Sequence, residues 1–173
     1  MGPAAFAKGG SLAVPSPRQA SWPLCSPSGK KAGSFVRFWD TSAVVPLIVE
    51  EECSSQASRW LAEDPEVVLW ILTPVELTSA LCRLVRDGGI SEVEAERAEK
   101  RVDELYGTCH RVVQVDTVIL QARRLLRLHP LRAADALQLA AALQWADGRP
   151  MGRRLHTFDV QLARAAVREG FAV

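Results

Sequence analysis

The sequence lacks the cysteine and histidine spacings that are typical of redox and metal sites. The four cysteines (Cys25, Cys53, Cys82 and Cys109) are far apart and form no C-x-x-C pair. The three histidines show no metal-ligand spacing either. We therefore expect reduced thiols in a cytosolic protein, and a cytoplasmic location, rather than a disulfide framework.

Long hydrophobic runs are also absent. No apolar stretch approaches the roughly 18 residues that a membrane-spanning helix needs, so no membrane association is expected. The net charge of +1 indicates no particular partner, but residues 1–34 carry four basic residues and no acid, which leaves −3 for the rest. A mildly acidic domain that handles nucleic acid needs local basic patches or metal ions.

The first 34 residues lack the composition of a folded domain. They contain five prolines, five glycines and six serines, and such a segment buries too little apolar surface to offset its chain entropy. We interpret residues 1–34 as a disordered leader, or as upstream sequence translated from a misassigned start. A transit peptide is the alternative, but no amphipathic, Arg-rich helix is evident.

Residues 35–173 alternate between strand-like and helix-like segments. The run VVLWIL at 67–72 is continuously apolar, as expected for a parallel strand that is covered on both faces. The pattern predicts a three-layer α/β/α sandwich with a central parallel sheet, resembling a Rossmann fold. Strands are predicted at 35–39, 67–72, 111–115 and 154–157, with a possible edge strand at 171–173. Helices are predicted at 42–50, 53–62, 73–87, 92–106, 117–128, 132–146 and 160–169.

Four carboxylates map to one edge of the predicted sheet. Asp40 directly follows the first strand, Glu76 lies one turn into the helix after the second, and Asp159 follows the fourth. Asp135 lies in the first turns of the helix before the fourth strand. Ligands of such sheets bind beyond the carboxyl ends of the strands, so these acids form a candidate site.

Each acid also has a purely structural interpretation. Asp40 and Asp159 fit helix N-caps, Glu76 fits a capping box with Thr73, and Asp135 fits the positive end of a helix dipole. Together these interpretations are weaker, because several carboxylates at one edge repel each other unless cations bind there. Oxygen ligands of this kind suit Mg²⁺ or Mn²⁺.

Four short motifs carry a family resemblance. DTSAVVPLIVEE at 40–51, TPVELTSAL at 73–81, LRAADALQLAAAL at 131–143 and TFD at 157–159 together resemble a PIN domain, specifically the VapC-type ribonuclease toxins. The resemblance covers about residues 35–173. It implies that Asp40, Glu76, Asp135 and Asp159 are the metal-binding catalytic residues, supported by three neighbouring hydroxyl residues, Thr41, Ser42 and Thr157. Gln138 departs from the His of many relatives, and we give this no weight because the position is not an acid.

The resemblance also implies a function. It predicts a Mg²⁺-dependent endoribonuclease, the toxin of a type II toxin–antitoxin pair, acting as a homodimer and silenced by a small antitoxin. Arginines near residues 123–132 and 149–154 are candidates for the positive field that RNA requires. The alternative is a catalytically inactive PIN fold that binds RNA or protein. A haloacid dehalogenase phosphatase is excluded because Ser42 stands where that family needs a second Asp.

Overall fold

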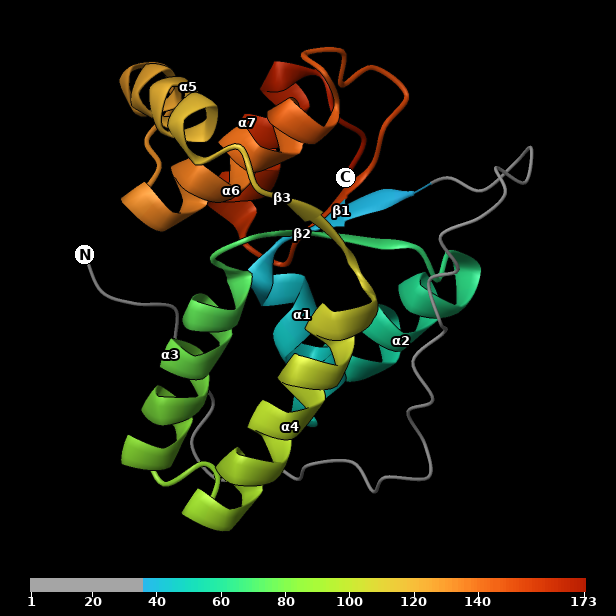
Figure 1. Ribbon diagram of the computed structural model, residues 1–173, viewed down its shortest axis with the longest axis vertical. Coiled ribbons are helices and arrows are strands. Elements are labelled where there is room, and N and C mark those ends of the chain that lie inside the picture. The colour runs from blue at the N-terminus through green and yellow to red at the C-terminus, as the bar shows by residue number, and fades with distance from the viewer. Residues whose placement is uncertain (1–35) are drawn as a thin grey trace.

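A four-stranded parallel sheet forms the centre of the protein in this computed structural model, which describes residues 36–173 (Figure 1). The strands are β1 (Arg37–Trp39), β2 (Val67–Trp70), β3 (His110–Val112) and β4 (Leu155–His156), in the order β3-β2-β1-β4. Around it lie α1 (Thr41–Ile48), α2 (Ser54–Glu63), α3 (Thr73–Arg86), α4 (Glu92–Thr108), α5 (Val115–Leu128), α6 (Ala133–Trp145) and α7 (Val160–Glu169). The predicted α/β sandwich with a parallel sheet is confirmed.

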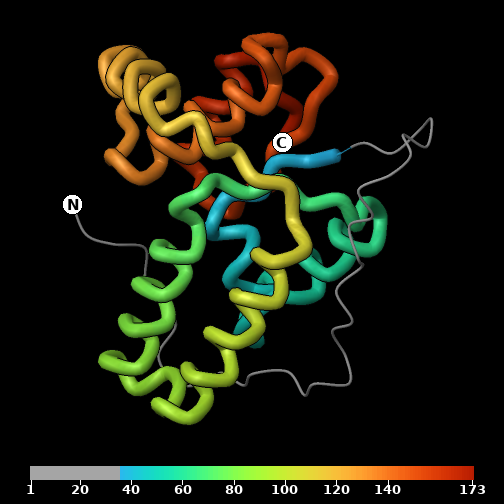
Figure 2. The backbone as a smooth tube through the Cα atoms, in the orientation of Figure 1, coloured from blue at the N-terminus to red at the C-terminus, as the bar shows by residue number. Residues whose placement is uncertain are grey.

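The helices divide between the two faces of the sheet, because successive strand side chains point to opposite sides. Phe38 packs into a cluster formed with α5, α6 and α7, whereas its neighbour Trp39 packs against α1 to α4. Both side chains are fully buried. Figures 1 and 2 show the same division, with α1–α4 on one side of the strands and α5–α7 on the other.

Local sequence signals account for several helix ends. Ser91 and Glu94 form the capping box at the start of α4: Ser91 N donates to Glu94 Oε2 at 2.8 Å, and Glu94 N donates to Ser91 Oγ at 3.3 Å. Helix α7 ends at Gly170, whose φ of 105° is open to glycine and costly for other residues. The helices therefore begin and end largely where the sequence predicts.

The possible edge strand at 171–173 is confirmed only as an isolated parallel bridge between Arg154 and Ala172. Leu155 N donates to the carbonyl of Ala172 at 2.9 Å, and Ala172 N donates to the carbonyl of Arg153 at 3.0 Å. The predicted start of the first strand at Phe35, and the whole leader at residues 1–34, lie outside the described residues.

Two smaller expectations concern thiols and membranes. Cys53, Cys82 and Cys109 are free, and Cys25 lies outside the described residues. Within residues 36–173, none of the helices has the length and apolar character that a bilayer crossing requires.

Candidate active site

Asp40 ends β1 and starts α1, at the carboxyl edge of the sheet. Its backbone N–H donates to the carbonyl of His156 at the end of β4, at 2.9 Å. Its Oδ2 accepts from Ser42 N at 3.1 Å, Ser42 Oγ at 2.6 Å and Thr157 Oγ1 at 3.0 Å. Asp40 is thus an N-cap, as the structural interpretation proposed, but a cap uses only one of its oxygens. The carboxylate is buried, and two hydroxyl residues beside it hold it in place.

Glu76 does not form the capping box with Thr73 that its spacing favours. Leu72 is the N-cap of α3, without a side-chain cap bond. Glu76 Oε2 instead accepts from Thr41 Oγ1 at 2.5 Å and from Gln138 Nε2 at 2.7 Å. Long-range contacts to α1 and α6 therefore override the local motif.

Asp135 and Asp159 lie at the starts of α6 and α7. Asp135 Oδ2 accepts from the backbone N–H of Arg132 at 3.4 Å. Asp159 Oδ1 accepts from Leu162 N at 2.7 Å, so the N-cap interpretation is correct for Asp159 as well. The Asp159 backbone N–H donates to Thr157 Oγ1 at 3.0 Å, which connects this helix start to the Asp40 network.

The four acids share one bonding pattern. Each accepts hydrogen bonds through a single carboxylate oxygen and leaves its other oxygen without a hydrogen-bond donor among the described residues. The free oxygens are Asp40 Oδ1, Glu76 Oε1, Asp135 Oδ1 and Asp159 Oδ2. None of these four oxygens is among the fully buried polar atoms that lack a hydrogen-bond partner. Each is therefore accessible to a ligand.

Burial and repulsion by neighbouring acids act in the same direction on three of the carboxylates, those of Asp40, Glu76 and Asp135. Desolvation raises the pKa of Asp40, and the nearby charge of Glu76 raises it further against the opposing hydrogen bonds from Ser42 and Thr157. Desolvation also raises the pKa of Glu76, and the charge of Asp135 raises it further. The pKa of Asp135 is raised by desolvation and by the charges of Asp159 and Asp40. All four acids are therefore electrostatic neighbours, and a cation among them would relieve their repulsion.

The donor set fits a hard cation held through water. Within residues 36–173, no three Asp, Glu, His or Cys side chains converge closely enough to form a complete metal centre. Mg²⁺ does not require such a cage, since it usually keeps several waters and binds one or two carboxylates directly. The free oxygens of Asp40, Glu76, Asp135 and Asp159 are of the type that it prefers.

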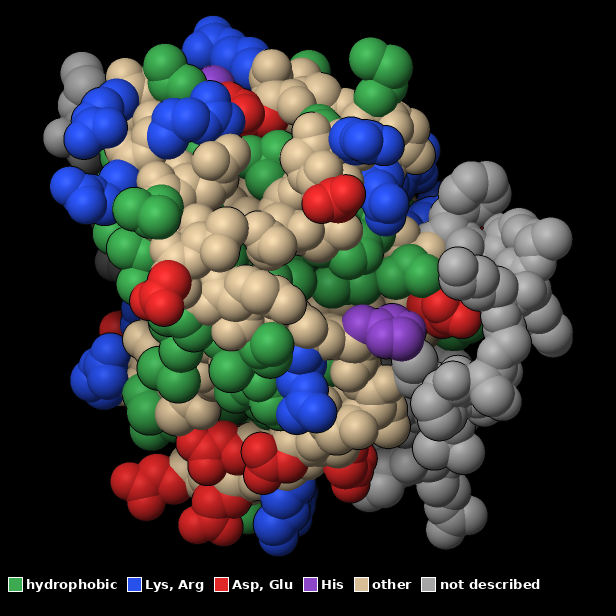
Figure 3. All heavy atoms as spheres, turned by 45° about the horizontal axis from the view of Figure 1, so that its top comes forward, with side chains coloured by type: hydrophobic (Ala, Val, Ile, Leu, Met, Phe, Trp, Pro, Cys, Tyr) green, Lys and Arg blue, Asp and Glu red, His purple; other side chains and the backbone are tan. Residues whose placement is uncertain are grey.

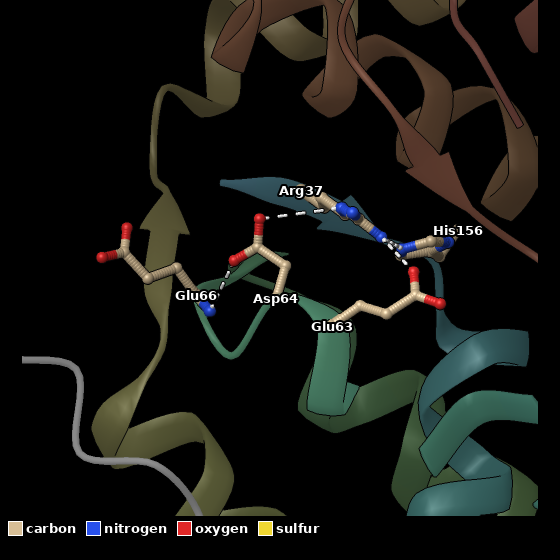
Figure 4. Close-up of polar contacts among 5 residues, drawn as sticks. All are labelled: Arg37, Glu63, Asp64, Glu66 and His156. Atoms are coloured by element: carbon tan, nitrogen blue, oxygen red, sulfur yellow. Dashed lines mark hydrogen bonds and ion pairs between the residues drawn. The ribbon is translucent and has the colours of Figure 1, made fainter. Parts of the chain in front are cut away.

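A cluster behind the site supports β4 and the start of α7. Arg37 Nη1 lies 3.3 Å from His156 Nε2 and 3.4 Å from Glu63 Oε2, and its Nε lies 3.7 Å from Asp64 Oδ2 (Figure 4). The Trp60 ring stacks on His156, with ring centroids 4.3 Å apart, and on Phe158 at 4.8 Å. Trp60 is partly buried and packs against the core cluster that contains Trp39.

Comparison with known proteins identifies the family. A model of the PIN domain matches residues 37–168. The chain belongs to the PIN domain family. It is 34% identical over 125 residues to Ribonuclease VapC45 of Mycobacterium tuberculosis (strain CDC 1551 / Oshkosh), and to the same extent to Ribonuclease VapC49 of Mycobacterium tuberculosis (strain ATCC 25618 / H37Rv). Each comparison covers 69% of this chain and 86% of the relative. The predicted resemblance to VapC-type PIN domains is confirmed.

The structure brings the predicted supporting residues into the site. Ser42 and Thr157 bond Asp40, and Thr41 bonds Glu76. Gln138, which is not among the predicted site residues, also bonds Glu76. The available signal was a polar side chain within the Ala- and Leu-rich run of α6, one turn after Asp135.

Proposed function

We propose that this protein is a metal-dependent endoribonuclease that cleaves RNA phosphodiester bonds as the toxin of a type II toxin–antitoxin pair. Membership of the PIN domain family and likeness to two VapC ribonucleases support the ribonuclease class. The observation that carries the catalytic assignment is the shared pattern of the four acids. Each has one anchored and one free oxygen at the same edge of the sheet.

The residues that would hold the metal are Asp40, Glu76, Asp135 and Asp159, and Mg²⁺ is the expected ion, with Mn²⁺ as a substitute. When bound, the metal supplies an activated water and stabilises the charge that develops on the scissile phosphate. The chain itself fixes the carboxylates. Ser42 and Thr157 orient Asp40, while Thr41 orients Glu76. No nucleophilic Cys, Ser or His is required.

The distribution of charge supports a polyanionic substrate. Residues 117–173 contain nine arginines and four acids, a net charge of +5, whereas residues 36–116 contain sixteen acids and eight basic residues, a net charge of −8. In Figure 3, Lys and Arg side chains are spread over the α5–α7 end, and Asp and Glu gather at the opposite end. The acidic net charge of the domain thus conceals a basic half that can attract RNA.

The seven candidate arginines differ in position. Arg132 lies close to Asp135. Burial raises the pKa of Asp135, and the positive charge of Arg132 partly opposes that rise. Arg153 and Arg154 precede β4 and so lie at the amino edge of the sheet, opposite the acids. Arg124 pairs with Glu169, and Arg153 stacks over the Trp145 ring at 4.8 Å. Of the candidate arginines that these contacts locate, Arg132 is therefore the one beside the acids, where it could contact RNA.

The proposed partners are a small antitoxin and a second copy of this chain. An antitoxin side chain that silences the site has to satisfy four neighbouring carboxylates, and Arg does this through charge-assisted hydrogen bonds. Expression of the chain alone should inhibit growth, and coexpression with the adjacent small gene product should relieve the inhibition. A harmless monomer under both conditions contradicts the toxin assignment.

The direct test of the enzyme is RNA cleavage by the purified protein with Mg²⁺, Mn²⁺ or a chelator. We expect cleavage with either ion and none with the chelator, and sequencing the new RNA ends then defines the target. The alternative, an inactive PIN fold that binds RNA or protein, predicts RNA retention without cleavage under every metal condition.

A further inference from the structure

The side chain of Gln138 is a polar group in an otherwise apolar stretch of α6. It is 1% exposed and lies among alanines and leucines that are themselves buried. Burying an amide is unfavourable unless hydrogen bonds replace those lost to water. A packing role alone at this position would be filled better by Leu or Met.

The hydrogen bonds of Gln138 are all made by one end of the amide. Its Nε2 lies 2.7 Å from Glu76 Oε2, 2.9 Å from Thr41 Oγ1 and 3.3 Å from Thr73 Oγ1. Its Oε1 is buried without a partner among the described residues. Turning the amide around would bring Oε1 against the Glu76 carboxylate, so Glu76 fixes its orientation.

These bonds join the two faces of the sheet at its carboxyl edge. Gln138 belongs to α6 on one face, whereas Thr41 in α1 and Glu76 in α3 belong to the other. Thr41 and Gln138 both bond Glu76 Oε2, which fixes the plane of the carboxylate and leaves Oε1 free. Side chains that orient a metal ligand in this way act on the site without touching the substrate.

We propose that Gln138 is a positioning residue of the acidic site, which holds Glu76 through Oε2 so that Oε1 is available to a divalent cation. The uncharged amide does this without adding to the negative charge of the site. The inference rests on the proposed function for its activity measurement, but cation binding tests it separately.

The test uses the full-length protein and three substitutions. Gln138→Met keeps the volume and removes the donors, and Gln138→His restores an N–H donor. Gln144→Met, later on α6, is the matched control, because its side chain makes no hydrogen bond to the described residues. For each protein we would measure Mn²⁺ binding by calorimetry, kcat and KM for RNA cleavage, and thermal melting without metal.

We expect Gln138→Met to weaken Mn²⁺ binding and to lower kcat by about 10–100-fold, as other residues that orient metal ligands do, with KM for RNA unchanged. Gln138→His should recover part of both losses, and Gln144→Met should match the wild type. If Gln138→Met does not fold, Gln138→Asn, whose amide stops one methylene short, is expected to show the same losses.

Unchanged Mn²⁺ affinity in a folded Gln138→Met protein overturns the inference, even if its melting temperature falls, because Gln138 would then only stabilise the packing of α6. Absence of Mn²⁺ binding by the wild type overturns it as well. A wild type that binds Mn²⁺ but cleaves no RNA contradicts the proposed function alone, and the calorimetric comparison still decides the role of Gln138.

Discussion

Arg37 donates a hydrogen bond from Nη1 to Nε2 of His156 over 3.3 Å. A guanidinium only donates, so Nε2 accepts and the neutral ring carries its proton on Nδ1. That Nδ1 is buried without a partner among the described residues. Burial, together with the charges of Arg37 and Arg154, lowers the pKa of His156 to about 3. The ring therefore stays neutral throughout the physiological pH range.

This relationship predicts destabilisation in acid. His156 takes up a proton near pH 6.5 in the unfolded chain but only near pH 3 in the folded chain. The contribution of the neutral ring to folding stability is therefore fully present above pH 6.5 and is lost as the pH falls toward 3. The loss is at most about 1.4 kcal/mol for each pH unit below 6.5. Urea unfolding between pH 7.5 and 5 should show the wild type losing more stability than His156→Gln, whose side chain does not titrate. Parallel losses in the two proteins would contradict the prediction.

The raised pKa values of three of the acids predict that cation binding weakens at a higher pH than it does for ordinary carboxylates. Burial and mutual repulsion raise the pKa of Asp40, Glu76 and Asp135 above the ordinary values of 3.8 to 4.5. A carboxylate must lose its proton to bind a metal, so protons compete at a higher pH than usual. Calorimetry between pH 7.5 and 4 should show Mn²⁺ affinity beginning to fall at a higher pH than the ionisation of ordinary carboxylates predicts. A fall that begins only where ordinary carboxylates take up protons would contradict the prediction.

The sequence predicts the acids better than it predicts what holds them. Asp40 and Asp159 follow strands, so the rule that strand ends meet at one edge is enough to place them together. Glu76 resembles a local cap of α3, but its partners Thr41 and Gln138 are 35 and 62 residues away, and no local pattern shows such contacts. Gln138 is not an acid, but a buried amide needs hydrogen-bond partners as much as a charge does.

Helix ends and strand pairing show the same contrast between local and distant causes. The capping box of Ser91 and Glu94 lies within one helical turn, so the local sequence is enough to specify it. The edge strand at 171–173 depends on pairing with Arg154, about 18 residues earlier, and only one bridge forms. The support of β4 by Arg37 and Trp60 depends wholly on tertiary packing, which the sequence pattern does not contain.

Arg132 provides a test of RNA contact. We expect Arg132→Gln to raise KM for RNA several-fold with little change in kcat, because a phosphate contact contributes binding but not chemistry. The slope of log affinity against log salt should become shallower by about 0.7, the value for one contact to a single strand. Arg149→Gln, in the loop after α6, is the matched control and should leave both quantities unchanged. Equal effects of the two substitutions would indicate only a general loss of positive charge.

The leader gives a prediction about the limits of the domain. The composition of residues 1–34 does not support a core, and we expect the domain to begin near Phe35. A chain beginning at Gly33 should keep the melting temperature and the RNA-cleaving activity. A fall of more than about 3 °C, roughly 1 kcal/mol for a domain of this size, would show that the leader packs on the domain.

Asp40→Asn separates the capping role of Asp40 from its proposed role as a metal ligand. Asparagine caps helices about as well as aspartate, so the amide oxygen of the variant side chain can still accept the bond from Ser42 N. The substitution removes one negative charge and the oxygen donor that a hard cation prefers. If Asp40 were only a cap, RNA cleavage would continue at the wild-type rate.

We expect instead a fall in cleavage larger than the roughly 10–100-fold typical of residues that only support a metal site, together with a higher Mg²⁺ requirement. Without metal, the melting temperature should hold or rise, because Glu76 repels Asp40 and burial disfavours its charge. The measurements are cleavage across a Mg²⁺ titration and metal-free thermal melts of both proteins. Near-wild-type cleavage by a folded Asp40→Asn protein would exclude Asp40 as a ligand, and a large loss of metal-free stability would show that its negative charge is needed for folding.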